Sequence, residues 1–159
     1  MTISAESGSV QELQELQELL DKSAITEVIH TVAHAMDARD WDLFATCYTP
    51  EAEGDYVNVN VAGREAIIAG TKALLDPLHA TQHLVGNLRV TIDDDIATTH
   101  ATFIAQHVRA EATGNGQYIL GGTYHDTLRR TDEGWKITRR QIRGIWSNGD
   151  PSVLPTPVS

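Results

Sequence analysis

The chain contains a single cysteine, Cys47, among its 159 residues, so no disulfide can form within it. A lone thiol is typical of proteins that work in a reducing compartment. No apolar run approaches the roughly 20 residues that a membrane-spanning helix requires, and the first residues lack the basic and apolar regions of a secretion signal. From these absences we expect a cytoplasmic protein without a membrane partner.

Basic residues are also scarce. Twelve Lys and Arg stand against 22 Asp and Glu, which gives a formal net charge of -10 at pH 7. No basic tract offsets this charge, so nucleic acid is excluded as an expected partner. The length suits one domain whose core needs neither disulfide nor metal. We place that domain at residues 11–148, ahead of a proline-rich tail over residues 149–159 that is unsuited to a sheet.

Patterns typical of helices occupy the first half of the chain. Residues 1–10 are small, polar and aperiodic, and we expect them to be disordered. Leucines at three-residue spacing then predict one helix, and a separate helix begins at an N-cap, Asp21 or Ser23. The helices predicted in this way span residues 11–20, 21–38, 40–48 and 64–75.

Strand patterns fill the rest of the chain. One strand is predicted over residues 55–61, and everything after Pro77 alternates as strands do. Turn sequences rich in Asp, Asn and Gly divide that region into segments of residues 80–92, 96–112, 117–131 and 135–147. Consecutive strands joined by short turns favour an antiparallel meander. The predicted fold class is therefore α+β, with N-terminal helices packed on one face of a curved, mostly antiparallel sheet.

The stretch from Thr81 to Asn87 carries the candidate proton carrier, His83. Alternation places His83 on the less apolar side of a predicted strand. The apolar side carries Leu84, Leu88, Val90 and Ile92. Imidazole has an unperturbed pKa near neutrality, so it suits proton transfer. Taken alone, however, the stretch favours a hydrogen-bonded structural histidine over a catalytic one.

Two further histidines, His30 and His34, lie four residues apart on a predicted helix, a spacing that can seat a metal ion beside Asp37. The histidine pair faces away from the apolar stripe of that helix, and no third cluster completes a ligand set. A solvated helix face explains the pattern better. We therefore predict no metal and no cofactor.

Several short motifs occur in an order and spacing that carries more information than any one of them. They are Asp37-Ala38-Arg39-Asp40-Trp41-Asp42, Asp55-Tyr56, Thr81-Gln82-His83, Gln106-His107, Gly121-Gly122-Thr123-Tyr124 and Asp132-Glu133-Gly134-Trp135-Lys136. With the helix order and the meander, they make residues 21–148 resemble the SnoaL-like branch of the NTF2-like superfamily. Within it, the chain is most similar to scytalone dehydratase and its relatives, the bile-acid 7α-dehydratases and the hexachlorocyclohexane dehydrochlorinase. The resemblance implies a cone, a bent sheet wrapped around helices with a mostly apolar cavity inside.

The resemblance also implies roles for individual residues. Asp37 and His83 match the Asp-His dyad of the dehydratases. His107 matches their second pocket histidine, and Tyr56 matches their water-binding tyrosine. Each also fits a plainer role: Asp37 as a helix-end cap, His107 on an outer face, and Tyr56 as a packing residue.

Three more residues are candidates for substrate binding. Tyr124 can offer a hydroxyl, Arg143 can bind an anionic group, and Trp146 can form a pocket wall near the mouth. The alternatives are packing for Tyr124, a solvated face or subunit contact for Arg143, and an interface for Trp146. Alternation sends Arg139 and Arg143 to one face of the last strand and Arg140 to the other.

The chain departs from these relatives at a few positions. Met36 replaces the tyrosine that precedes the aspartate of scytalone dehydratase, and Gly122 and Tyr124 replace its serine and asparagine. Val32 stands where the dehydrochlorinase has a lysine that assists chloride departure. These losses argue against the fungal pigment substrate and against chloride elimination.

The predicted function is a cofactor-independent dehydratase that uses an Asp-His dyad on a small hydrophobic substrate, carbonyl-bearing or polycyclic. Polyketide cyclisation or ketosteroid-type isomerisation is an alternative, because it needs the base but no acid for a leaving group. A non-catalytic ligand-binding or subunit-assembly domain is a third reading, since this superfamily hosts many functions. The resemblance further implies a homotrimer.

Overall fold

A computed structural model describes residues 3–56, 59–112 and 114–155, without the side chains of residues 3–7. The helices are α1 (Ile3–Ala38), α2 (Trp41–Thr46), α3 (Arg64–Leu75) and the short 3-10 helix η1 (Pro151–Val153). The strands are β1 (Tyr48–Tyr56), β2 (Val59–Ala62), β3 (Ala80–Asp93), β4 (Ile96–Val108), β5 (Gln117–Thr131) and β6 (Gly134–Gly149). None of the helices in the described ranges has the length and apolar character that crossing a bilayer requires.

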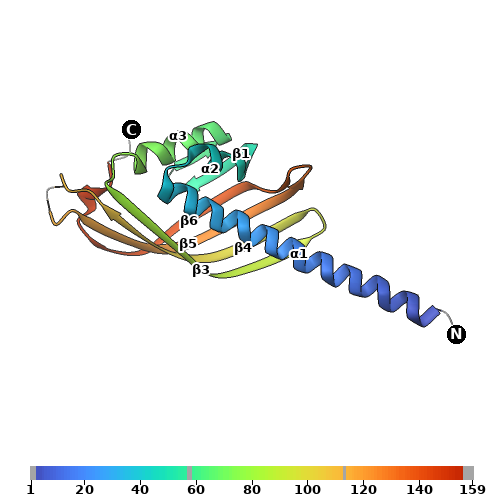
Figure 1. The fold of residues 1–159 in the computed structure, drawn as a ribbon. Helices are drawn as coiled ribbons and strands as arrows, with labels where there is room; N and C mark the ends of the chain where they lie inside the picture. The colour runs from blue at the N-terminus through green and yellow to red at the C-terminus, as the bar shows by residue number, and fades with distance from the viewer. Residues whose placement is uncertain (1–2, 57–58, 113, 156–159) are drawn as a thin grey trace.

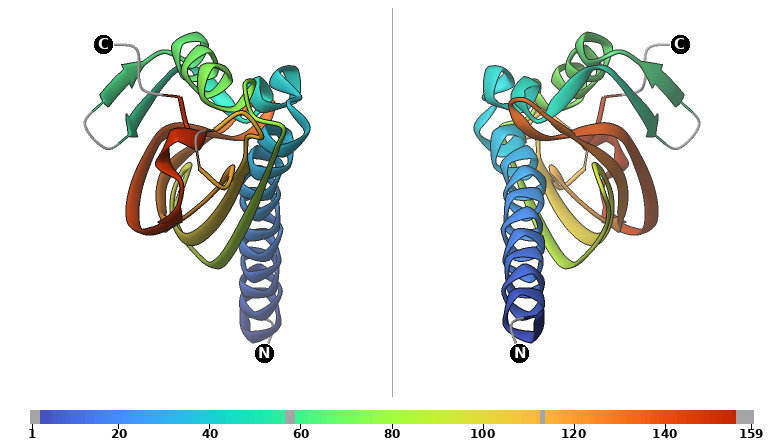
Figure 2. Two further views of the ribbon diagram at one scale, coloured as in Figure 1. Left: turned by 90° about the vertical axis from the view of Figure 1, so that its left-hand side faces the viewer. Right: turned by 90° about the vertical axis from the view of Figure 1, so that its right-hand side faces the viewer.

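All six strands form one sheet in the order β2-β1-β6-β5-β4-β3. Strands β3 to β6 pair antiparallel as a meander, whereas β1 runs parallel to β6. The sheet is strongly curved, and α1 lies across its inner face with α2 and α3 beside it (Figures 1 and 2). The predicted α+β cone and its meander are confirmed.

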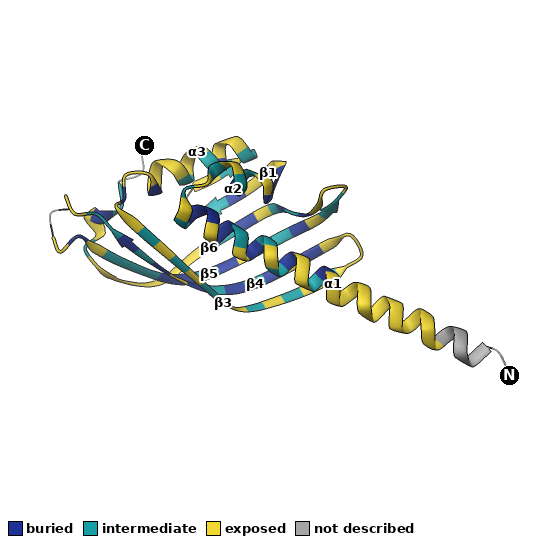
Figure 3. Cartoon of the chain, viewed as in Figure 1, coloured by how far each residue is buried: buried dark blue, intermediate teal, exposed yellow. Residues whose placement is uncertain are grey.

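The N-terminal helices differ from the prediction. One continuous helix of 36 residues, α1, replaces the two predicted helices, and it begins at Ile3, inside the segment expected to be disordered. Asp21 is not a cap, because its carboxylate is used in tertiary contacts and the strong helix formers on both sides continue one helix through it. The N-terminal part of α1 projects beyond the sheet as an arm, which is exposed over residues 8–20 (Figures 1 and 3). Its exposed apolar residues are Val10, Leu13, Leu16, Leu19 and Leu20.

The segment between α2 and α3 also differs. The predicted third helix ends at Thr46, and Tyr48 already begins β1. Where one strand was predicted over residues 55–61, β1 and β2 form an antiparallel pair in which Tyr56 lies opposite Val59. Residues 57 and 58 of that predicted strand lie outside the described residues.

A bulge in β3 determines which of its side chains face inward. Between Gly86 and Arg89 the strand holds one more residue than β4 does, and Asn87 has a positive φ of 52°. Ahead of the bulge His83 faces the inner side and Leu84 is 61% exposed. Beyond it the apolar residues Leu88, Val90 and Ile92 pack against the core. The prediction that Leu84 shares a face with them is therefore wrong.

The main core lies between α1, α3 and the inner face of the sheet. It is built from fully buried aliphatic and aromatic side chains, among them Ile25, Ile29, Val32, Ile67, Leu75, Leu128 and Ile137. Val153 of η1 is also fully buried, so the segment after β6 closes back onto the same core. This arrangement fixes the C-terminal end of α1 against the start of β3.

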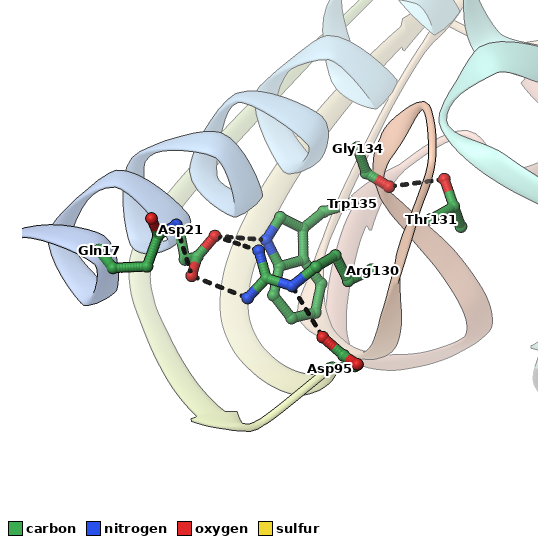
Figure 4. A network of polar contacts seen from close by, with 7 residues as sticks. All are labelled: Gln17, Asp21, Asp95, Arg130, Thr131, Gly134 and Trp135. Carbon is green, nitrogen blue, oxygen red and sulfur yellow. Dashed lines mark hydrogen bonds and ion pairs between the residues drawn. The ribbon is translucent and has the colours of Figure 1, made fainter. Parts of the chain in front are cut away.

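A polar network holds α1 where it leaves the domain (Figure 4). The two carboxylate oxygens of Asp21 accept hydrogen bonds from Arg130 at 2.6 and 2.8 Å, and one also accepts from Trp135 Nε1 at 3.0 Å. Arg130 Nε donates to Asp95 at 2.9 Å, on the turn between β3 and β4. The hydrogen bonds from Arg130 hold the pKa of the Asp21 carboxyl well below its usual range. One carboxylate thus joins the helix to two turns of the sheet.

Candidate active site

The end of α1 brings Asp37 into contact with His83 near the start of β3. Asp37 Oδ2 accepts a hydrogen bond from the backbone N–H of His83 at 2.8 Å, and Asp37 Oδ1 lies 2.6 Å from His83 Nδ1. The side chain of His83 is only 6% exposed, and that of Asp37 is 25% exposed. Both oxygens of one carboxylate are therefore committed to one histidine.

This contact decides the protonation pattern of the imidazole. A carboxylate can only accept hydrogen bonds, so Nδ1 of His83 carries the proton that faces Asp37. In the neutral ring, Nε2 then holds the free lone pair and can accept a proton. The arrangement matches that of a general base whose charged form is stabilised by a carboxylate.

His107 lies beside this pair on β4. The rings of His83 and His107 are perpendicular, with their centroids 5.9 Å apart, and His107 is 3% exposed. Burial, and then the charge of His83, lowers the pKa of His107 to about 4. His107 therefore stays neutral near pH 7. The alternative that it lies on the outer face is wrong.

Two buried polar atoms at this place lack a partner among the described residues. They are Nδ1 of His107 and Oγ1 of Thr81, which lie on directly opposed residues of β4 and β3. Buried polar atoms in native proteins are nearly always hydrogen-bonded, so such atoms call for a partner such as a water or a ligand. Asp37, Thr81, His83 and His107, together with Tyr124 described next, are called the inner-face site below.

Tyr124 completes this group from β5. It is 3% exposed, its ring stacks on Phe103 with 4.3 Å between centroids, and the guanidinium of Arg140 lies 4.5 Å above the ring. Burial raises the pKa of Tyr124 well above its ordinary value, and the charge of Asp37 contributes to the rise. The hydroxyl of Tyr124 is therefore a neutral hydrogen-bond donor within the electrostatic range of the Asp37 carboxylate.

Tyr56 lies at the end of β1, half-buried, and its ring covers Gly54. A side chain at position 54 would place its Cβ 2.3 Å from the ring of Tyr56, so only glycine leaves room for it. Burial raises the pKa of Tyr56 to about 12. Its electrostatic neighbours are Arg140 and Asp126 rather than His83. Tyr56 is also an electrostatic neighbour of Tyr124, whose pKa it helps to raise, so it borders the inner-face site.

The prediction from sequence did not include the buried ion pair between Arg140 and Asp126. Nε and Nη2 of Arg140 each donate to one oxygen of Asp126 at 2.7 Å, and both side chains are almost fully buried. Strand alternation predicted that Arg140 lies on the other face of β6 from Arg139 and Arg143, and the structure confirms this. The same alternation puts Asp126 and Tyr124 on one face of β5. The ion pair between Arg140 and Asp126 could therefore have been predicted from the register of β5 and β6.

Two predicted substrate-binding residues point away from this site. Arg143 donates to both oxygens of Asp55, at 3.0 and 3.1 Å, on the outer face of the sheet. Trp146 is 47% exposed and covers Gly121 on the same outer face, because Ile145 is an extra residue in β6 that reverses the alternation. Neither residue contributes to the inner-face site, and we correct both predictions.

The remaining candidate positions lie elsewhere. His30 and His34 are exposed on α1. The described residues contain no group of three His, Cys, Asp or Glu side chains that could hold a metal ion. A cleft of about 460 Å³ opens between α1, α2 and the start of β6, with Val28, Leu43, Cys47 and Trp135 among its lining residues. That cleft includes none of the predicted site residues.

Comparison with known proteins identifies the family. The family model that describes the SnoaL-like domain matches residues 17–141 of the sequence. The chain belongs to the SnoaL-like family. Its superfamily, predicted from the motifs, is thereby confirmed as SnoaL-like and NTF2-like.

Relatives of this SnoaL-like chain span most of its length. The uncharacterised protein Rv2910c of Mycobacterium tuberculosis is 30% identical over 127 residues, which cover 77% of this chain and 84% of that protein. The crystal structure of the Kfla4162 protein from Kribbella flavida is 25% identical, covers 86% of this chain and 98% of that one, and superposes with a TM-score of 0.79.

The hexachlorocyclohexane dehydrochlorinase LinA-type3 from Novosphingobium barchaimii has the same fold. It is 16% identical to this chain, with 91% of this chain and 96% of that one covered and a TM-score of 0.76. At this identity the likeness concerns the fold. The SnoaL-like chain therefore shares its fold with this dehydrochlorinase.

Proposed function

We propose that this SnoaL-like protein is a cofactor-independent lyase of the dehydratase type. Its substrate is a small hydrophobic molecule, carbonyl-bearing or polycyclic, with a hydroxyl at the β position. The observation that carries the proposal is the two-point contact between Asp37 and His83. This contact leaves a buried imidazole with its free lone pair beside two polar atoms, on Thr81 and His107, that have no partner in the described part of the chain.

In the proposed reaction His83 removes the proton next to the substrate carbonyl. The C–H bond breaks, the proton moves to Nε2, and the electron pair forms an enolate. Asp37 stabilises the resulting imidazolium through Nδ1–H, as the aspartate does in a catalytic triad. The enolate then expels the β-hydroxyl group as the C–O bond breaks, and His83 returns its proton to that group so that water leaves.

His107 serves in this scheme as a hydrogen-bond donor to a substrate oxygen. A histidine with a pKa of about 4 is neutral at pH 7, so it is a weak source of protons for a departing hydroxyl. We therefore assign protonation of the departing hydroxyl to His83. A neutral imidazole held in a dry place still stabilises charge that develops on an oxygen. Tyr124 supplies a neutral hydroxyl as a second donor for the same purpose, and Tyr56 acts through a water.

The test uses a panel of β-hydroxy ketones followed by enone absorbance. We expect His83→Ala and Asp37→Asn each to lower kcat by roughly 10²–10⁴-fold, the range of general acid–base catalysis. His30→Ala is the matched control, because His30 is an exposed histidine on the same helix as Asp37. Turnover that survives both site variants, or no turnover by the wild-type protein across a chemically broad panel, contradicts the proposal.

An isomerase or cyclase is the second candidate, and the neutral state of His107 favours it. Such a reaction needs a base and a donor that stabilises the enolate, but no group that assists departure of water. With a β,γ-unsaturated ketone as substrate, the isomerase proposal predicts a shift of the double bond without release of water. A ligand carrier is indicated instead if the wild-type protein turns over no substrate and His83→Ala still binds the ligand.

The proposed assembly is a homotrimer that forms through the outer face of the sheet. Leu84, Ile104 and Trp146 lie in one register across β3 to β6, with Gly121 beneath Trp146. Their exposed fractions are 61%, 41% and 47%. An apolar row of this kind on a sheet is typical of a contact surface. Ile104→Glu is expected to lower the mass measured by light scattering to that of a monomer, and an unchanged mass contradicts this assembly.

A further inference from the structure

The C-terminal end of α1 has an uncommon backbone at Arg39. Its φ is +56°, a left-handed conformation that a residue with a side chain adopts rarely. The N–H of Arg39 donates to Met36 O at 3.2 Å, and the N–H of Asp40 donates to Ala35 O at 2.9 Å, so this residue closes the helix. Asp37 lies two positions before it. The orientation of Asp37 therefore depends on how the helix ends.

The side chain of Arg39 reaches to the element that leads into β3. Its Nη2 donates to the carbonyl of Leu78 at 2.6 Å and to the carbonyl of Leu75 at 3.3 Å. Leu75 ends α3, and Leu78 lies five residues before His83. A second bond crosses the same junction, because Trp41 Nε1 donates to Asp76 Oδ1 at 3.2 Å. The corner that carries Asp37 is thus tied to the corner that carries His83.

We propose that Arg39 is a positioning residue for the inner-face site. It holds the end of α1 against the connection between α3 and β3, and so it sets the geometry of the Asp37–His83 contact. Its consequence for turnover rests on the function proposed above, but its effect on the contact does not. Glycine is the residue expected at a left-handed helix end. An arginine there indicates that the hydrogen bonds of its guanidinium to Leu75 and Leu78 matter in addition to the helix cap.

The deciding variant is Arg39→Gly, because glycine accepts the left-handed backbone and removes only the side chain. Arg39→Lys is the rescue variant, since an ammonium group can donate to one of the two carbonyls. Ile137→Val is the control for stability, because it trims a fully buried core residue on β6 away from this junction. Asp37→Ala provides the reference for a broken Asp37–His83 contact, because alanine offers no hydrogen-bond acceptor.

The first measurement is the tautomer of neutral His83, read from its ring nitrogen shifts through the carbon-bound ring protons. The wild-type protein is expected to hold the proton on Nδ1, as the contact with Asp37 requires. Arg39→Gly should move the ring nitrogen shifts towards those of Asp37→Ala, Arg39→Lys should fall between, and Ile137→Val should match the wild type. A merely structural arginine would lower the melting temperature and leave the tautomer unchanged.

The second measurement is turnover of the best substrate. A displacement of about 1 Å at a catalytic pair costs roughly 10²-fold in rate, so we expect a loss of that size in kcat for Arg39→Gly with KM within about twofold. If Arg39→Gly has the same His83 nitrogen shifts and the same kcat as the wild-type protein, the inference is overturned. If no substrate is turned over by the wild-type protein, the proposed function fails, and the tautomer of His83 in Arg39→Gly still decides the role of Arg39.

Discussion

Removing the carboxylate of Asp21 should destabilise the protein by a predictable amount. Asp21→Ala leaves Trp135 Nε1, on a residue only 5% exposed, without its acceptor. An orphaned buried donor costs about 1–3 kcal/mol. The ion pair with Arg130, whose side chain is 35% exposed, adds about 1 kcal/mol at most, and the better helix propensity of alanine returns about 0.6 kcal/mol. The expected loss is therefore about 2 kcal/mol.

Thermal and urea unfolding, followed by circular dichroism and tryptophan fluorescence, measure this loss. For a chain of this size 2 kcal/mol corresponds to a fall in Tm of roughly 4–8 °C. Asp21→Asn separates the two contributions, because its amide oxygen can still accept from Trp135 while the charge is gone. Asp21→Asn should therefore lose only about 1 kcal/mol.

Two further measurements test the reasoning. In a Trp135→Phe background the cost of Asp21→Ala should fall, since no indole donor is left unpaired. The folded pKa of Asp21 is depressed, so its contribution is present above the unfolded pKa of about 3.9 and is lost as the pH falls below that value. A change in unfolding free energy below about 0.5 kcal/mol for Asp21→Ala, or an equal cost in both backgrounds, would refute the account.

The remaining predictions concern other parts of the fold. Deletion of residues 1–16 should leave Tm within about 2 °C, because Val10, Leu13 and Leu16 are exposed, and a larger fall in Tm would show that these side chains are buried in solution. The buried His107 must charge on unfolding, so stability should decline by up to about 1.4 kcal/mol per pH unit between pH 6.5 and 4, and His107→Gln should flatten that decline in acid titrations. Gly122→Ala should lower Tm strongly, since the new Cβ would lie 2.2 Å from the backbone oxygen of Arg143, and an unchanged melting curve would mean that β6 can shift there.

The Asp37–His83 pair shows how far a resemblance can go beyond periodicity. Helical periodicity alone placed Asp37 on the flank of an apolar stripe, which fits a cap as well as a site. The motif order matched Asp37 to His83, and the structure brings their side chains within 2.6 Å. No pattern in the sequence contained the junction that holds them, because Arg39 meets Leu78 only when the end of α1 lies against the connection between α3 and β3.

The sequence by itself determined the meander, its turns, the helix over residues 64–75 and the opposite faces of Arg140 and Arg143, because these follow from propensities and alternation over a few residues. Tertiary structure decided which face Leu84 and Trp146 take. Alternation assigns faces only as far as the next bulge, and each bulge reverses every position beyond it. Bulges in β3 and β6 arise from how the neighbouring strands pair, so they are fixed only when the sheet assembles.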